Sequence, residues 1–353
     1  FHKRSTRAFE RVDMLNMLNN TARRRTKRGK RRSFGEHGDD RREDGKYFES
    51  KKREYKIMHE LRFISDAHMV QSRDATGKTF LMKSSVLDTI RIDFLMNERF
   101  FYAEIQNVTG DKSRLVQLLD SGNNPDFKFH IFEPYHCTID SSIKASPVRN
   151  LSLGTVAHIA RETLKAIEAL HKLGYVHCSI APRSFFLGIP PQESKIYLAN
   201  FVCARKAEDR KEASKHFFPE LTKYAPMAYH ESRALERKDD LESWFYVILQ
   251  IFNKEAMAWR TMKEEDEQYK LKVQLMKKTN ESPSKKLLPA PLLSLINDID
   301  LTTVSSPVDY KSMMCAIDLL DKMDDRPADK RQIEWTGKVD RVGDWELIKT
   351  DKN

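Results

Sequence analysis

The most constraining feature of this chain is a loop-forming stretch, residues 177–188, with the sequence HCSIAPRSFFLG. It follows residues 152–173, in which apolar side chains recur at steps of three and four; this spacing predicts an amphipathic helix that ends at Gly174. It precedes a short apolar run at 196–199 and a second loop at Asn200-Phe201-Val202. We therefore predict a helix, a loop, a short strand and a second loop in that order, and the rest of the chain must fit around them.

Length and composition predict a globular protein with an ample core. The chain has 353 residues, 40% of them hydrophobic, which suffices for one two-lobed domain or two ordinary domains. No apolar run approaches the roughly 20 residues that a membrane span needs, and no secretory leader is visible in a chain that opens on Phe1. The four cysteines are irregularly spaced, which disfavours a disulfide framework or a zinc site and favours an intracellular compartment, cytoplasmic or nuclear.

The positive charge of the chain is concentrated near its N-terminus. The formal net charge is +10, and residues 1–52 alone hold 17 Lys and Arg against 8 Asp and Glu. We predict that residues 1–52 are a disordered basic tail, because they cannot bury enough apolar surface to offset the entropy of ordering. Within them, Arg23–Arg32 holds eight basic residues and no acid. This segment is either a solvated linker, a nuclear signal, or a contact for nucleic acid or another polyanion.

Residues 53–132 have the pattern of a small β-rich unit with one helix. Tyr55–Lys83 predicts two strands joined by a turn at Asp74–Lys78. Phe94–Ile105 has helical periodicity and carries Glu98. Two further strand-like pieces and a break in the pattern follow, at Leu115–Leu119, Phe127–Phe132 and Glu133-Pro134-Tyr135.

The later part of the chain is predicted to be mainly helical. Leu241–Phe252 is apolar almost all round, which is typical of a buried helix, whereas Met262–Glu281 is strongly charged and predicts a solvated helix plus loop. Ser306–Asp309 has the sequence of a capped helix start with Pro307 in the first helical position. The buried face of this last helix is predicted to consist of Met313, Ala316, Ile317, Leu320 and Met323.

Several motifs, in order, are similar to those of the casein kinase I family of protein kinases, above all its tau-tubulin kinase and nematode-expanded branches. Tyr175–Gly188 resembles the catalytic loop of that family, and Arg237–Ser243 (RKDDLES) resembles the start of its buried helix. Tyr224-Ala225 and Ala258-Trp259-Arg260 match two shorter family motifs, with Ala258 where the family has Pro. The resemblance covers residues 53–345.

This resemblance implies an α+β, two-lobed protein-kinase fold. The small lobe, β-rich with one long helix, would occupy residues 53–132, and a hinge would occupy 133–136. The large, mainly helical lobe would occupy 137–345, and a short C-terminal tail 346–353.

The same resemblance implies that the groups for phosphoryl transfer are missing. Ser179 stands where the family has the Asp that orients the substrate hydroxyl, and a hydroxyl is not a base near neutral pH. Ala181 replaces the Lys that neutralises the transferred phosphoryl group, and Ser184 replaces an Asn that holds a metal ion. Asn200 replaces the metal-binding Asp, so no set of charged oxygen ligands for Mg²⁺ remains.

Nucleotide binding is predicted to be lost as well. The glycine-rich loop of the family falls on residues 62–67 (RFISDA), which hold no glycine for close approach to phosphates. Bulky side chains align with the walls of the adenine pocket, and we expect them to fill its volume. The pocket positions are Met69, Leu81, Phe132, Tyr135 and Phe186. We therefore predict no bound ATP, Mg²⁺ or other metal ion.

Residues that hold a kinase fold together are, by the same resemblance, still present. Lys83 and Glu98 align with the small-lobe ion pair; they are either remnants of the phosphate site or a pair that positions the helix, and we favour the second. His177 and Phe201 align with a stacked apolar column between the lobes. Asp240 aligns with the carboxylate that holds the backbone of the catalytic loop.

Two further residues near the loop are predicted to have no chemical role. Cys178 replaces the Arg that would pair with a phosphorylated activation segment, so control by that switch is not expected. His171 is predicted to lie on the surface of its helix.

The leading hypothesis is a catalytically inactive kinase-like protein, a pseudokinase, that acts as a protein-binding or scaffold module. One alternative is an atypical serine/threonine kinase that uses displaced acidic residues together with ATP and Mg²⁺. A second alternative is a nucleic-acid or polyanion binder that acts through Arg23–Arg32. The sequence names neither a protein partner nor an oligomeric state.

Overall fold

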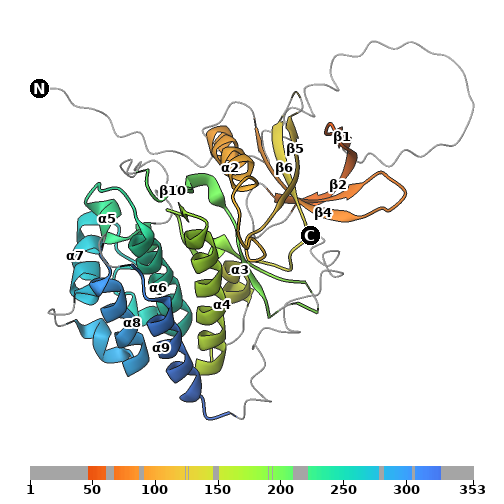
Figure 1. The fold of residues 1–353 in the computed structure, drawn as a ribbon. Coiled ribbons are helices and arrows are strands. Elements are labelled where there is room, and N and C mark those ends of the chain that lie inside the picture. The colour runs from red at the N-terminus through yellow and green to blue at the C-terminus, as the bar shows by residue number, and fades with distance from the viewer. Residues whose placement is uncertain are drawn as a thin grey trace, which may run out of the picture. The chain divides into compact units, whose positions relative to one another are not determined.

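The computed structural model of this chain describes residues 47–60, 67–86, 91–123, 125, 127–145, 151–189, 191–192, 194–209, 222–277, 282–303 and 307–326. These residues form an antiparallel sheet with one helix, followed by a mainly helical region (Figure 1). The α+β, two-lobed architecture predicted from the sequence is thus confirmed. None of the helices in the described ranges is long and apolar enough to cross a membrane.

The small lobe is a six-stranded sheet in the order β1-β2-β3-β4-β6-β5, and every neighbouring pair of strands is antiparallel. Helix α2 (Arg91–Ile105) packs against β4, the strand before it in the chain, and against β6, the second strand after it. The strands are β1 (Tyr47–Glu49), β2 (Glu54–Glu60), β3 (Ala67–Ser72), β4 (Thr79–Val86), β5 (Leu118–Asn123) and β6 (Phe127–Phe132).

The folded lobe begins before residue 53, which corrects the predicted end of the tail at residue 52. Phe48 in β1 is buried, and its ring stacks on Tyr55 with centroids 5.2 Å apart. Ser50 then donates a 2.5 Å hydrogen bond to Asp120 in β5, so the β1–β2 turn contacts the opposite edge of the sheet. Sequence reasoning missed this strand because three residues among charged neighbours carry little periodicity. Residues 1–46, with Arg23–Arg32, lie outside the described residues.

A second correction concerns the predicted strand at Leu115–Leu119. Strand β5 begins at Leu118, and Leu115 instead makes an isolated parallel bridge with Leu198 in the large lobe. After β6 ends at Phe132, residues 133–137 form neither helix nor strand; they include the predicted hinge at 133–136, which stays a prediction.

The large lobe consists of helices with two short two-stranded sheets. In these sheets β7 (Tyr175–Val176) pairs with β10 (Arg205–Lys206), and β8 (Phe185–Leu187) pairs with β9 (Ile196–Leu198). The α-helices are α3 (Ile139–Ala145), α4 (Leu153–Lys172), α5 (Met227–His230), α6 (Arg237–Asn253), α7 (Glu265–Met276), α8 (Ala290–Leu301) and α9 (Tyr310–Lys322). The 3₁₀ turns are η1 (Pro182–Ser184), η2 (Phe201–Cys203), η4 (Thr222–Tyr224), η5 (Lys254–Ala256) and η6 (Pro283–Leu287).

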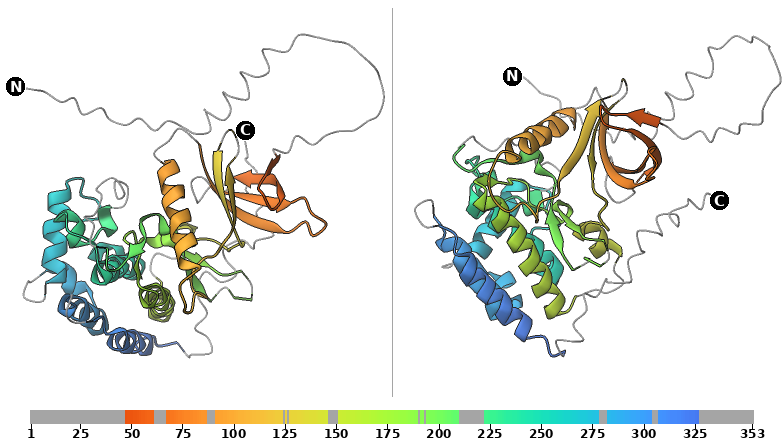
Figure 2. Two further views of the ribbon diagram at one scale, coloured as in Figure 1. Left: turned by 45° about the horizontal axis from the view of Figure 1, so that its top comes forward. Right: turned by 45° about the vertical axis from the view of Figure 1, so that its right-hand side comes forward.

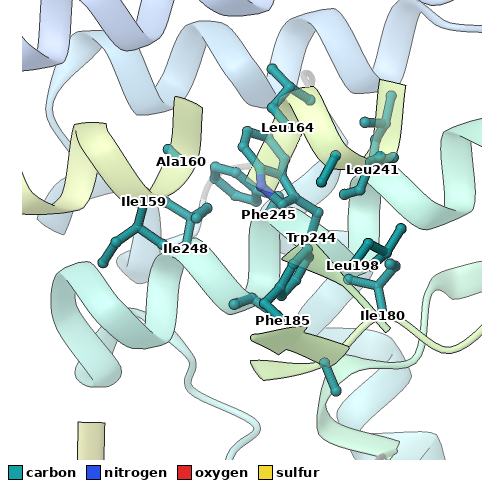
Figure 3. Packing of buried hydrophobic residues seen from close by; sticks show 14 of the residues in the cluster. Ile159, Ala160, Leu164, Ile180, Phe185, Leu198, Leu241, Trp244, Phe245 and Ile248 are labelled. Atoms are coloured by element: carbon teal, nitrogen blue, oxygen red, sulfur yellow. The ribbon is translucent and has the colours of Figure 1, made fainter. Parts of the chain in front are cut away.

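Helices α4 and α6 form the centre of the large lobe. Ile159 and Leu164 of α4 lie in one fully buried cluster with Trp244, Phe245 and Ile248 of α6 (Figure 3). The buried indole of Trp244 donates a 2.8 Å hydrogen bond to Thr163, so its one polar atom is satisfied. Phe185 of β8 lies in the same cluster and joins the loop region to this core (Figure 3). The two views of Figure 2 show α9 lying alongside α4.

Two helices differ in detail from the prediction. Helix α7 is not solvated all round, because Lys272 and Leu275 on its inner face are fully buried. Helix α9 begins after Asp309, whose side chain accepts a hydrogen bond from the Ser312 amide, so Pro307 lies before the helix and not in its first position. Met323 is 47% exposed and is not part of the buried face, whereas Met313, Ala316, Ile317 and Leu320 are buried as predicted.

Candidate functional site

The predicted catalytic loop is a buried, internally bonded turn between β7 and β8. Ser179, Ala181 and Ser184 all lie in it, and each is at most 7% exposed. The Ser184 hydroxyl donates to the Ser179 carbonyl oxygen (3.0 Å) and accepts from the Ala181 amide (3.3 Å). Three of the four substituted positions thus lie in one loop, where Ser184 bonds to the loop backbone, and the fourth, Asn200, bonds to the same loop at Arg183.

Asp240, the second Asp of the RKDDLES motif, anchors the start of this loop. Its carboxylate accepts from the backbone amides of His177 (2.6 Å) and Cys178 (2.8 Å). Cys178 has φ of +62°, a conformation that L-residues other than Asn and Asp adopt rarely, and the two amide bonds fix it there. Burial raises the pKa of Asp240, but these bonds and His171 outweigh it and hold that pKa below its usual value.

His171 is the third hydrogen-bond partner of this carboxylate. The prediction that His171 lies on the helix surface is therefore wrong. Its ring is buried, with Nε2 2.9 Å from Asp240 and Nδ1 bonded to the Tyr310 hydroxyl of α9. A helical position in the last turn of α4 looks exposed in the sequence, and only the packing of α6 and α9 covers it.

Asn200, in the second loop, links the two lobes. Its backbone has φ of +64°, which Asn tolerates better than most residues. Its side-chain Nδ2 donates to the Arg183 carbonyl oxygen (2.8 Å), and its Oδ1 accepts from Lys83 Nζ in β4 (3.3 Å). The sequence could not show that the Arg183 carbonyl accepts this bond, because every residue has a backbone carbonyl.

Lys83 and Glu98 form the predicted ion pair, with Nζ and Oε2 2.9 Å apart. Glu98 is 1% exposed, and its other oxygen accepts from the Phe201 amide (3.1 Å). His130 of β6 lies 3.5 Å from Glu98. Burial raises the pKa of the Glu98 carboxyl, but the Lys83 ammonium and His130 outweigh it and lower that pKa to about 2.

Aromatic rings continue this contact between the lobes. Phe201 stacks on Phe101 of α2 with centroids 4.3 Å apart, and the His177 ring lies 5.5 Å from Phe201. His177 Nε2 bonds to the Ala199 carbonyl (2.9 Å), and its Nδ1 accepts from the Ser179 amide (3.2 Å). Burial lowers the pKa of His177, which fits the neutral ring that these two bonds require.

The predicted pocket positions lie close to one another. In the sheet, Leu81 pairs with Met69 on one side and with Phe132 on the other. Leu81, Phe132 and Phe186 are all less than 10% exposed. The half-buried ring of Tyr135 lies 5.6 Å from that of Phe186. Of the glycine-free segment 62–67, only Ala67 falls within the described residues.

The cysteines beside the loops are not activated nucleophiles. Cys178 is buried, and burial raises the pKa of its thiol far above the ordinary value. Burial likewise raises the pKa of Cys203 to about 12, so neither thiol ionises near neutral pH. In the described ranges, no three His, Cys, Asp or Glu side chains gather as metal ligands would.

Comparison with known proteins finds partial sequence similarity to serine/threonine-protein kinases. No family model matches it. A probable serine/threonine-protein kinase of Dictyostelium discoideum is 27% identical over 159 residues, which cover 43% of this chain and 32% of that protein. The serine/threonine-protein kinase spe-6 of Caenorhabditis elegans is 29% identical over 123 residues, 33% of this chain and 32% of that protein. The chain therefore spans only about a third of the length of either relative.

A solved structure supports the fold. The structure of vaccinia related kinase 3 superposes with a TM-score of 0.61 at 16% identity, covering 79% of this chain and 90% of that one. The chain thus has a two-lobed protein-kinase fold, and part of it is similar in sequence to serine/threonine kinases. Fold alone does not decide activity, so function has to be argued from the site.

Proposed function

We propose that this chain is a catalytically inactive, casein kinase I-like protein that serves as a protein-binding or scaffold module. The observation that carries the proposal is the bonding of Ser184 and Asn200. These two side chains stand at the metal-binding positions, and both bond to the backbone of the catalytic loop, at Ser179 and Arg183. They are neutral and committed to internal partners, whereas Mg²⁺ requires free, preferably charged, oxygen ligands.

The neighbouring carboxylates offer no substitute for the missing acids. Residues 177–188 and 199–203 contain no Asp or Glu. Glu98 is bonded to Lys83 and to the Phe201 amide, and Asp240 is bonded to two loop amides and His171. Taking either one as a base would break the contacts that hold the loops. General-base assistance typically contributes about 10²–10⁴ in rate, so its loss alone slows transfer severely.

A binding role is supported by what the site still holds together. The ion pair, the aromatic stack and the Asp240 bonds connect the lobes and the loop through the chain's own residues. Lobes that are joined by such internal contacts suit a protein partner, because less entropy is lost on binding. The four free cysteines favour an intracellular setting for this role.

Nucleotide titration is the direct test of the proposal. We expect ATP, with or without Mg²⁺, to cause no thermal shift and no calorimetric signal up to millimolar concentration. A dissociation constant in the micromolar range would overturn the proposed inactivity at its first step, and a kinase known to bind ATP serves as the positive control.

Weak serine/threonine kinase activity is an alternative function, and the partial exposure of Lys83 favours it. Lys83 keeps its pairing with Glu98 and is still 23% exposed, so it could meet a phosphate. A radiolabel assay on general protein substrates separates the two functions. We expect no incorporation; label that Lys83→Ala abolishes would establish the kinase and refute our proposal.

Polyanion binding through Arg23–Arg32 stays a separate proposal, because these residues lie outside the described ranges. It is supported by the eight basic residues in that segment. It can coexist with either function of the folded lobes.

A further inference from the structure

Asn200, in the second loop, stands where the family has a metal-binding Asp, and its side chain makes two bonds of its own. In an active kinase, the nucleotide and its metal ions connect the small-lobe Lys to the loops of the large lobe. In this chain a side chain spans the same gap. Asn200 bonds to Lys83 of β4 through Oδ1 and to the Arg183 carbonyl through Nδ2.

We propose that this Asn200 bridge, from Lys83 Nζ through the Asn200 amide to the Arg183 carbonyl, is a ligand-independent clasp. It holds the lobes and the catalytic loop in one fixed arrangement, in place of a bound nucleotide and metal ion. The inference rests on the proposed function, because a clasp of this kind is useful only if the site takes no nucleotide.

The chemistry of the amide explains why Asn suits this place better than Asp. The Arg183 carbonyl is an acceptor, and only a donor 2.8 Å away satisfies it. A carboxylate at residue 200 would still accept from Lys83, but it would face the Arg183 carbonyl with a second acceptor. Asn and Asp both tolerate the left-handed backbone at this position, so the side-chain donor is what distinguishes them.

The bridge is continuous with other contacts between the lobes. Lys83 is held by Glu98, and Glu98 accepts from the amide of Phe201, the residue after Asn200. On the other side, the Ala199 amide donates to the Ser184 carbonyl (2.8 Å), which ties the second loop to the first. One bond of Asn200 therefore ends on a lysine that Glu98 holds, and the other ends next to the residue whose carbonyl the Ala199 amide holds.

Hydrogen exchange of the full chain in nucleotide-free, EDTA-containing buffer tests the clasp. In Asn200→Asp we expect amides in residues 177–184 to exchange about tenfold faster, because the bond to Arg183 is lost. Peptides from β4 and α2 should stay within twofold of wild type, since the carboxylate still accepts from Lys83. In Asn200→Ala, which removes both bonds, both regions should exchange faster.

Asn107→Asp is the matched control. Asn107 Nδ2 also donates to a backbone carbonyl, that of Ala103 (3.2 Å). This bond is local to the end of α2 and does not connect α2 to another helix, strand or loop. It makes the same chemical change and should leave residues 177–184 as in wild type. If Asn200→Ala fails to fold, the nearly isosteric Asn200→Asp carries the test, with circular dichroism to confirm its fold.

Two results would overturn the clasp. One is exchange in residues 177–184 of Asn200→Asp within twofold of wild type; the other is equal acceleration everywhere, including buried helix α6. The ATP titration is independent of this assay. Binding of ATP by the wild type together with the expected exchange pattern would refute the proposed function alone, and unchanged exchange without ATP binding would refute the clasp alone.

Discussion

Replacing Glu98 by Gln should reveal how much the buried ion pair stabilises the fold, and the effect should depend on pH. The variant keeps the shape of the side chain and an oxygen for the Phe201 amide, but Lys83 loses its counter-charge. Glu98 is 1% exposed, so solvent screens this loss little.

The magnitude follows from the pKa of Glu98, which falls from its ordinary value of 4.5 to about 2 in the folded protein. Each tenfold change in proton affinity corresponds to about 1.4 kcal/mol, so the charged form contributes about 3 kcal/mol to the free energy of unfolding at pH 7. Because the folded pKa is the lower one, this contribution is complete above pH 4.5 and disappears as pH falls through 2. At pH 3 it should be only about 1.4 kcal/mol.

Urea denaturation of wild type and Glu98→Gln at pH 7 and at pH 3 measures both values. The difference in free energy of unfolding should shrink by about half between the two pH values. Glu104→Gln is the control, because Glu104 lies exposed on the same helix and accepts one bond from Tyr175; it should change stability by less than about 1 kcal/mol. A Glu98→Gln effect that is equal at the two pH values would show that the charge is not responsible.

Three further changes test other parts of the structure. Asp240→Asn should lower the free energy of unfolding by about 3 kcal/mol in urea denaturation, because an amide cannot accept from both loop amides and His171 at once; a loss below 1 kcal/mol would argue against its anchoring role. Phe48→Ala should cost about 3 kcal/mol by the same measurement, since the ring is 6% exposed; a neutral result would place β1 outside the folded lobe. Deleting residues 1–46 should abolish salt-dependent binding to a heparin column and leave the melting temperature unchanged; retained binding would locate the polyanion site in the folded lobes.

Sequence reasoning predicted the architecture well where periodicity or motif order was strong. Helix α4 follows from recurring apolar positions and helix α6 from a stretch that is apolar almost all round, and their bounds lie within a few residues of the prediction. It failed where a residue's environment is supplied by a distant element. His171 and Lys272 are polar residues on helices, and only packing against other parts of the chain buries them.

The same limit applies to the candidate site. Alignment with a family identifies which residue stands at each position, but it does not show where the new side chain bonds. That Asn200 would reach both Lys83 and the Arg183 carbonyl depends on loop geometry, which no local pattern encodes. The contact of Ser50, just after β1, with Asp120 was missed for a related reason, since it joins residues 70 positions apart.

The internal bonding of the site also predicts that restoring single residues will not restore catalysis. Asn200→Asp would place a carboxylate beside the Arg183 carbonyl instead of a free metal ligand. Ser179→Asp would put a charge at a position that is only 7% exposed. The backbone carbonyl of that residue already accepts a hydrogen bond from the Ser184 hydroxyl. At residue 200 the acid gives up the side-chain bond to the Arg183 carbonyl, and at residue 179 it is a buried charge. We therefore expect the double variant Ser179→Asp/Asn200→Asp to stay inactive in the radiolabel assay and to be less stable than wild type. Activity in that variant would show that only the missing groups, and not the bonds that replaced them, keep the site inactive.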